Sequence, residues 1–309
     1  MDPHRVGTLL EELLAQLGFR QADREPVRVW SMSGVERLHL PDGHAVIFKY
    51  SRGPFTDEHL TLRHARAHGL PVPELLSAAT TYDPQTGDDI LGMLLEDLGD
   101  PAREPTLAEA AAAAVAIQQV PALPGRPGLD SAALATLPSR ALKRLATLQA
   151  AGRWHDPALA RHLRALAAVA YDRCHDAEIP PWGMLHSEFH PTSLHVDGSG
   201  RWRLLDMARA CTAPGVLDLV SWQGTQTAPD TAALYELLVA YVAAGGPATA
   251  LSNRAGLPVT RWAIGWHRMW IVDWYLEQAA RWIPTPALDE NAVAVVVRHL
   301  AEAVDALSA

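Results

Sequence analysis

The sequence predicts an α+β fold, with a small β-sheet lobe at the N-terminus and a larger, mostly helical C-terminal lobe. Short segments of strand character lie near the N-terminus, and the one at residues 45–50 ends beside Lys49. From residue 107 onward, alanine-rich runs and apolar residues at helical spacing favour helices. The segment from Asp100 to Pro105 holds two prolines and is a natural boundary. We therefore expect an N-terminal lobe over residues 1–99 and a C-terminal lobe over 100–309.

The elements of the first lobe follow from local patterns. Apolar residues at helical spacing predict the first helix, alternation predicts strands, and glycines or prolines predict the breaks. The expected order is a helix over 6–17, a strand over 27–30, a small-residue turn over 31–37, strands over 37–40 and 45–50, a helix over 55–68 and a buried strand over 90–96.

In the second lobe the alanine run over 110–114 favours a helix that is broken at residues 121–128. Five further helices are expected, over 132–150, 157–174, 231–244, 259–282 and 288–307. The fourth carries Trp262, Trp266, Trp270 and Trp274 at four-residue steps. Such a stripe is typical of packing between helices. The alternative is that these rings form an aromatic wall of a substrate pocket.

Composition excludes several classes of protein. A chain of 309 residues suffices for about two domains, and its net charge of −9 argues against general nucleic-acid binding. Only two cysteines occur, Cys174 and Cys211, so we expect a reduced, cytoplasmic setting without disulfides. No uninterrupted apolar run is long enough for a membrane span.

The chain is organised around residues 184–210. Leu194–Val196 and residues 202–205 can pair as a hairpin across turn residues 197–200. The hairpin would separate Glu188, on the loop before it, from Asp206, just after it. Two acids so placed, with Ser193 between them, would suit a divalent metal and a hydroxyl substrate. The alternative is an ordinary hairpin with exposed acids.

Three segments resemble the aminoglycoside phosphotransferase family, whose members are kinase-like enzymes. His186–Ser193 is similar to the family's catalytic loop His-Gly-Asp-x-His-Pro-x-Asn, and Leu204–Asp206 is similar to its metal-binding strand end. The segment from Gly215 to Leu219 is similar to the next family motif. Glu188 replaces the usual base Asp and Ser193 replaces the usual metal-ligand Asn. The resemblance implies a two-lobed, protein-kinase-like fold.

The resemblance also implies a nucleotide site in the first lobe. Lys49, one of only two lysines, would contact ATP phosphates and pair with a helix acid, Glu58. A lid over the phosphates would include Ser33 and Gly34. Backbone groups around Glu96 and Leu98 would bind adenine at the hinge between the lobes.

In catalysis, the resemblance assigns Mg²⁺ to Asp206, with Ser193 as a weaker second ligand. Glu188 would orient the acceptor hydroxyl and take its proton. His186 belongs to the same catalytic loop and, with Asp218, would support it structurally.

We therefore expect an ATP- and Mg²⁺-dependent phosphotransferase that acts on a hydroxyl of a small molecule or peptide. Acids exceed bases only slightly from residue 99 onward, so a polycationic acceptor is not expected. Because Glu188 and Ser193 depart from the family pattern, a pseudokinase-like binding or scaffold protein is the alternative. No nucleic-acid or membrane partner is expected, and the oligomeric state is left open.

Overall fold

The computed structural model describes residues 1–126, 128–283 and 285–308. The chain forms two compact units, each built from two separate stretches of sequence. Unit 1 comprises Met1–Pro105 and Pro191–Ala210, and unit 2 comprises Thr106–His190 and Cys211–Ala309. The first lobe predicted from sequence ended at residue 99, whereas unit 1 continues to Pro105 and gains a second segment.

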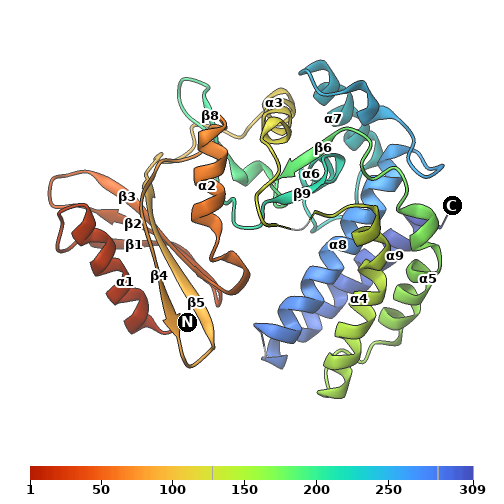
Figure 1. Cartoon of the computed structure of the whole chain (residues 1–309), viewed down its shortest axis with the longest axis horizontal. Helices are drawn as coiled ribbons and strands as arrows, with labels where there is room; N and C mark the ends of the chain where they lie inside the picture. Colours follow the sequence, from red (N-terminus) through yellow and green to blue (C-terminus); the bar gives the residue numbers. More distant parts are fainter. Residues whose placement is uncertain (127, 284, 309) are drawn as a thin grey trace. The chain divides into compact units, whose positions relative to one another are not determined.

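A five-stranded antiparallel sheet forms the body of unit 1, in the order β1-β2-β3-β5-β4 (Figure 1). Its strands are β1 (Asp23–Val29), β2 (Ser33–His39), β3 (Ala45–Arg52), β4 (Leu75–Asp83) and β5 (Asp88–Glu96). Strand β1 is an edge strand that is exposed throughout, whereas β3 and β5 are largely buried. The central strands therefore carry the core, as their apolar runs require.

Helix α1 (Pro3–Gln16) covers one face of this sheet, and α2 (Glu58–Ala67) lies on the opposite side (Figure 1). The apolar stripe of α1 packs on buried residues of β2, β3 and β5, including Phe48 and Leu94. The approach is closest at Gly92, where a Cβ would lie 2.7 Å from a methyl of Leu9. A side chain at position 92 would require Leu9 to shift, so Gly92 lets the helix pack closely on the sheet.

The hairpin predicted after residue 193 is confirmed, with β7 (Leu194–Val196) antiparallel to β8 (Trp202–Leu204). Two backbone hydrogen bonds tie it to the rest of unit 1: Leu204 N donates to Pro71 O at 2.8 Å, and Ala102 N donates to Val196 O at 2.9 Å. The sequence-based division placed this hairpin in the C-terminal lobe. These bonds explain why it joins unit 1 instead.

Strand β2 begins earlier than expected. Residues 31–37 were predicted to form a turn, but Ser33 and Gly34 pair with Ser51 and Tyr50 across β3. Small residues lower strand propensity, so the sequence pattern gave no sign of this pairing.

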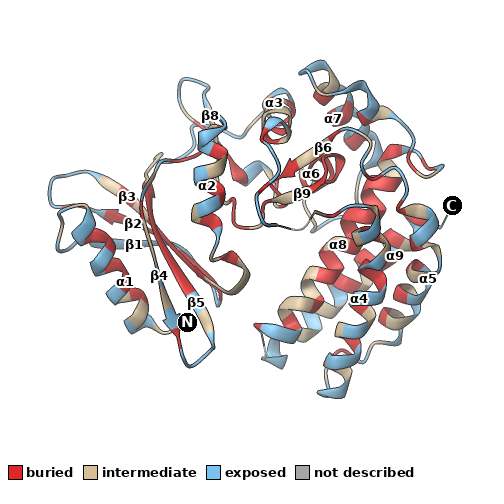
Figure 2. Cartoon of the chain, viewed as in Figure 1, coloured by how far each residue is buried: buried red, intermediate tan, exposed pale blue. Residues whose placement is uncertain are grey.

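Unit 2 is mainly helical, and four helices, α4, α5, α8 and α9, pack together in it. The buried positions of α8 lie along much of its length, whereas those of α4 and α5 follow one side (Figure 2). No helix in the described part of the chain is long and apolar enough to cross a membrane. The elements of unit 2 are α3 (Leu107–Gln119), α4 (Ser131–Ala150), α5 (Pro157–Arg173), β6 (Trp182–Leu185), β9 (Cys211–Pro214), α6 (Val216–Ser221), α7 (Thr231–Ala243), α8 (Val259–Arg281) and α9 (Asp289–Leu307).

The tryptophan stripe of α8 is core at its N-terminal end. Trp262 and Trp266 are fully buried, and both indole N–H groups donate to Arg173 O, at 2.8 and 2.9 Å. Trp270 and Trp274 are half-buried. Helix packing, the first of the two predicted roles, therefore accounts for Trp262 and Trp266.

Candidate functional site

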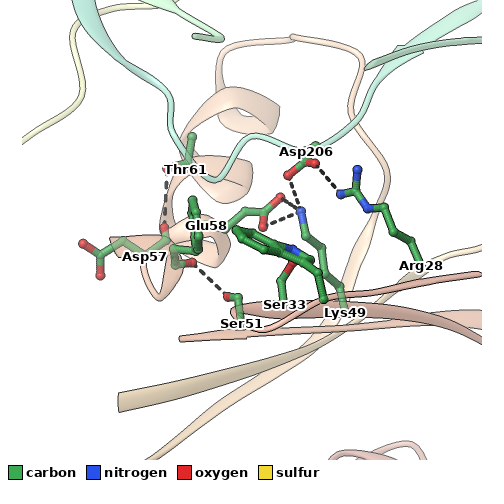
Figure 3. Close-up of polar contacts among 10 residues, drawn as sticks. Arg28, Ser33, Lys49, Ser51, Asp57, Glu58, Thr61 and Asp206 are labelled. Atoms are coloured by element: carbon green, nitrogen blue, oxygen red, sulfur yellow. Dashed lines mark hydrogen bonds and ion pairs between the residues drawn. The ribbon is translucent and has the colours of Figure 1, made fainter. Parts of the chain in front are cut away.

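One buried lysine holds two carboxylates from separate elements of unit 1. The Lys49 Nζ, on β3, lies 2.7 Å from Glu58 Oε1 of α2 and 2.6 Å from Asp206 Oδ1, just after β8 (Figure 3). Lys49 and Glu58 are buried, whereas the Asp206 side chain is 29% exposed. The structure thus brings together three residues predicted for the site.

The three charges shape one another's protonation. Burial lowers the pKa of Lys49, but the carboxylates of Asp206 and Glu58 raise it by more, so the lysine stays protonated. Burial raises the pKa of Asp206, but Lys49 and Arg28 lower it well below its usual range. Burial also raises the pKa of Glu58, against the opposing effect of Lys49. Of the two carboxylates, Asp206 is therefore the one that is firmly ionised.

Sequence reasoning missed a fourth member, Arg28 of β1. Its Nη2 donates to Asp206 Oδ2 at 3.0 Å, so each carboxylate oxygen of Asp206 faces a cation (Figure 3). Pro26, inside an edge strand, was the available signal, because proline there accompanies irregular pairing. The pairing register does shift between Pro26 and Arg28.

These charged residues stand at a cavity of about 500 Å³. Its described lining residues all belong to unit 1. Apolar side chains such as Val35, Ile47 and Leu95 form much of the wall, and Glu96 and Leu98, the predicted hinge residues, also line it. A cavity that combines apolar walls with a few polar or charged groups is typical of small-ligand sites.

The two residues predicted for the phosphate lid, Ser33 and Gly34, agree less well with the cavity than the hinge residues do. Among the described residues, Ser33 and Gly34 are absent from the cavity lining, although Val35 is present. The Ser33 hydroxyl accepts a hydrogen bond from Trp30 Nε1. A Cβ on Gly34 would lie 2.2 Å from Cζ of Tyr50, so packing against this ring explains the glycine. A nucleotide role for Ser33 and Gly34 stays a prediction.

The β7–β8 hairpin positions both predicted metal ligands. Leu205 N donates to Ser193 O at 2.8 Å, which fixes Ser193 across from the residue that precedes Asp206. Asp206 itself has φ +64°, in the left-handed region that few residues other than glycine adopt. Such strained backbone is concentrated at functional sites. The same hairpin therefore sets the spacing of the two residues and the unusual backbone of Asp206.

The catalytic-loop residues lie in unit 2, on the segment between β6 and Pro191. Asp218 of α6 is fully buried and accepts two backbone hydrogen bonds, from His186 N at 2.7 Å and from Ser187 N at 2.8 Å. Burial raises the pKa of Asp218 to about 7, although both N–H groups act to lower it. Asp218 thus fastens the loop to α6, in the supporting position that the sequence suggested.

Glu188 lies on this fastened loop and is half-buried. The two residues that follow Glu188 are anchored: the Phe189 ring centroid lies 4.9 Å from that of Trp222, and His190 Nδ1 lies 2.8 Å from Ser221 O. The imidazole of His186 is buried in the same place. The loop is therefore anchored on both sides of Glu188.

A preformed metal cage is not present in the described part of the chain. No three His, Cys, Asp or Glu side chains lie together there as a metal-binding group. Mg²⁺ is usually bound by one or two carboxylates together with substrate phosphates and waters. The single carboxylate of Asp206, beside the buried Ser193, fits a metal that arrives with a nucleotide.

The fold and the site together define a protein-kinase-like chain: a five-stranded antiparallel sheet with a lysine–glutamate pair, and a helical part that carries an anchored loop. Residues 37–255 match the family described as "Phosphotransferase enzyme family" (APH), which is more than half of the sequence. The chain belongs to this family. No curated protein sequence matches the chain significantly.

Solved structures share the fold at low sequence identity. A choline/ethanolamine kinase family protein from Mesorhizobium loti has a TM-score of 0.62 at 16% identity, covering 99% of both chains. Amicoumacin kinase hAmiN, in complex with AMP-PNP, Ca²⁺ and Ami, has a TM-score of 0.59 at 13% identity, covering 99% of this chain and 94% of that one. Macrolide 2'-phosphotransferase MphH from Brachybacterium faecium has a TM-score of 0.57 at 18% identity, covering 95% and 98%.

Proposed function

We propose that the protein is an ATP- and Mg²⁺-dependent phosphotransferase that transfers the γ-phosphate to a hydroxyl of a small molecule or peptide. The observation that carries this proposal is the buried Lys49, held between Glu58 and Asp206 beside the cavity. A compact ammonium group that two carboxylates hold in place suits a phosphate oxygen. The structural relative solved with AMP-PNP and Ca²⁺ supports a nucleotide and a divalent metal here.

Each residue of the candidate site would have a distinct role. Lys49, positioned by Glu58, binds the nucleotide phosphates, and the backbone of residues 96–98 binds the base. Asp206 and Ser193 would hold Mg²⁺, which neutralises charge on the phosphates when bound. Glu188 orients the acceptor hydroxyl and takes its proton.

The charge pattern of unit 2 supports an acceptor that is not a polycation. The two acids near the C-terminal end of α8, Asp273 and Glu277, are paired with arginines. Arg140 and Arg144 contact Asp273, and Arg144 also lies 3.0 Å from Glu277. Neutralised acids attract a polycation less strongly than an exposed acidic cluster.

A second candidate, a pseudokinase-like binding or scaffold protein, is favoured by one observation. Glu188 and Ser193 stand where the resembled loop carries Asp and Asn. Glu188 is one methylene longer than Asp, and a misplacement of about 1 Å at a catalytic group can cost roughly 10²-fold in rate.

Nucleotide-binding calorimetry combined with an ATP-consumption screen of hydroxyl compounds tests the proposal. Lys49→Ala should weaken ATP binding, whereas Lys143→Ala, which removes the only other lysine and is exposed, should not. Glu188→Gln should lower turnover by roughly 10²-fold and leave nucleotide affinity unchanged.

Two results would contradict the proposal. Equal ATP affinity in Lys49→Ala and the natural protein would remove the nucleotide assignment. Nucleotide binding without phosphoryl transfer to any hydroxyl compound would favour the pseudokinase alternative.

A further inference from the structure

The edge strand β1 contains a β-bulge. Pro26 lies opposite Glu36 on β2, but Arg28 lies opposite Val35, so one extra residue stands between the two pairs. A bulge of this kind changes which face of the sheet the following side chains occupy. Bulges are frequent beside functional sites, where they redirect a side chain.

The bulge determines where Arg28 points. Side chains alternate between the faces of a sheet, so a regular strand would place Arg28 on the face of Pro26, away from the cavity. The shifted register puts it on the face of Val35 and Lys49, which are themselves paired and both line the cavity. There its guanidinium reaches Asp206 Oδ2 (Figure 3).

The Arg28 side chain competes for the same oxygen that a metal would need. Lys49 occupies Asp206 Oδ1 from a buried position, whereas the Arg28 side chain is 61% exposed. A pair this exposed is weak, and its long side chain can rotate away at little cost. A divalent metal ion bound to Asp206 would repel the Arg28 guanidinium.

We propose that Arg28 is a nucleotide-site residue with two alternative partners. It holds Asp206 Oδ2 while no metal is bound, and it turns to the nucleotide phosphates when the metal–nucleotide complex takes that oxygen. The planar guanidinium is suited to both partners, because it donates paired hydrogen bonds to carboxylates and to phosphates. This inference rests on the proposed nucleotide-dependent function.

Calorimetric titration of AMP-PNP at a series of Mg²⁺ concentrations tests the exchange without requiring turnover. The variant is Arg28→Gln, which removes the charge and keeps a polar side chain. The control is Arg24→Gln on the same strand. Arg24 pairs with Glu36 on the other face, and among the described residues it is not part of the cavity lining.

Two changes are expected in Arg28→Gln and not in Arg24→Gln. The Mg²⁺ concentration that gives half of the tightening of AMP-PNP binding should fall roughly 5-fold, because no cation has to leave Asp206. At saturating Mg²⁺, the Kd for AMP-PNP should rise roughly 5-fold, because a phosphate contact is lost.

The inference is wrong if Arg28→Gln leaves the half-effective Mg²⁺ concentration unchanged or raises it, or if its Kd at saturating Mg²⁺ equals that of the natural protein. In those cases normal AMP-PNP binding by the natural protein would leave the proposed function intact. If the natural protein bound no AMP-PNP at any Mg²⁺ concentration, both proposals would fail.

Discussion

Ser187 occupies a backbone conformation that its side chain disfavours. Its φ is +74°, and its buried hydroxyl oxygen has no hydrogen-bond partner among the residues that the structure describes. The resembled catalytic loop carries glycine at this place, and a left-handed φ costs glycine nothing. The hydrogen bond from Ser187 N to Asp218 fixes the conformation nevertheless. The loop therefore stores local strain next to Glu188.

Ser187→Gly should stabilise the protein. The substitution removes both the backbone strain and the buried hydroxyl, and we expect a gain of about 1–2 kcal/mol after the entropy cost of glycine. Denaturant unfolding measures the change. Ala255→Gly is the matched control, because Ala255 has φ +49° and no hydroxyl, so its gain should be smaller. A loss of stability in Ser187→Gly would contradict this account.

The residues of the candidate site could be predicted to different extents. Lys49 stood out as one of two lysines, and the resemblance supplied Glu58 and Asp206. Arg28 could not be found by alternation, because the bulge reverses its face. The role of Gly34 in a phosphate lid stays a prediction, and its close contact with the Tyr50 ring, on the neighbouring strand, could not be predicted from the local sequence. Tertiary contacts of this kind leave no local pattern.

At the scale of elements, α6 acts on the catalytic loop through one carboxyl group. The Asp218 side chain accepts the backbone N–H groups of His186 and Ser187, and burial raises its pKa to about 7. The folded protein therefore keeps a proton on Asp218 between about pH 4 and 7, where the unfolded chain has lost it. This difference lowers the free energy of unfolding as the pH rises through that window.

Asp218→Asn removes this titration. The stability of the natural protein relative to the variant should fall as the pH rises from 4 to 7, and it should level off above pH 7. Denaturant unfolding across that range checks the slope. Asp197→Asn is the control: hydrogen bonds from Ser199 and Arg201 lower the pKa of Asp197, so its effect should be constant there. A constant difference for Asp218→Asn would mean that the carboxyl is ionised throughout.

The elements of the site differ in how well local sequence specifies them. Asp197, Gly198 and Gly200 predicted the β7–β8 hairpin, because the turn needs residues that tolerate positive φ, and Gly200 has φ +83°. The start of β2 was missed, because its residues pair with β3 despite low strand propensity. Turn chemistry is local, whereas strand pairing depends on the partner strand.

At the scale of the whole molecule, the cavity draws on both sequence stretches of unit 1. Its lining includes Ile47 and Leu98 from the first stretch, and Leu205 and Asp206 from the second. The predicted division at residue 99 could not foresee this. That prediction rested on proline content at one boundary. Hydrogen bonds between residues that are distant in sequence determine which unit the hairpin joins.

Hydrogen exchange measured by mass spectrometry should detect this arrangement. Addition of Mg²⁺ and AMP-PNP should slow amide exchange in two separate stretches, residues 45–98 and residues 204–207, because ligand binding stabilises what surrounds the cavity. Lys49→Ala should lose both effects together. Protection limited to the first stretch would contradict the assignment of Asp206 to the site.

The divided unit 1 also has a consequence for synthesis on the ribosome. At translation rates of roughly 5–20 residues per second, about 5–20 s separate residue 105 from residue 210. During this time Lys49 and Glu58 have been synthesised, but Asp206 has not. Leu204, whose N–H donates to Pro71 O in the folded protein, has not been synthesised either. A nascent chain therefore carries a five-stranded sheet in an unfinished unit 1 for several seconds, and the lining of the cavity is complete only when about two-thirds of the protein has been translated.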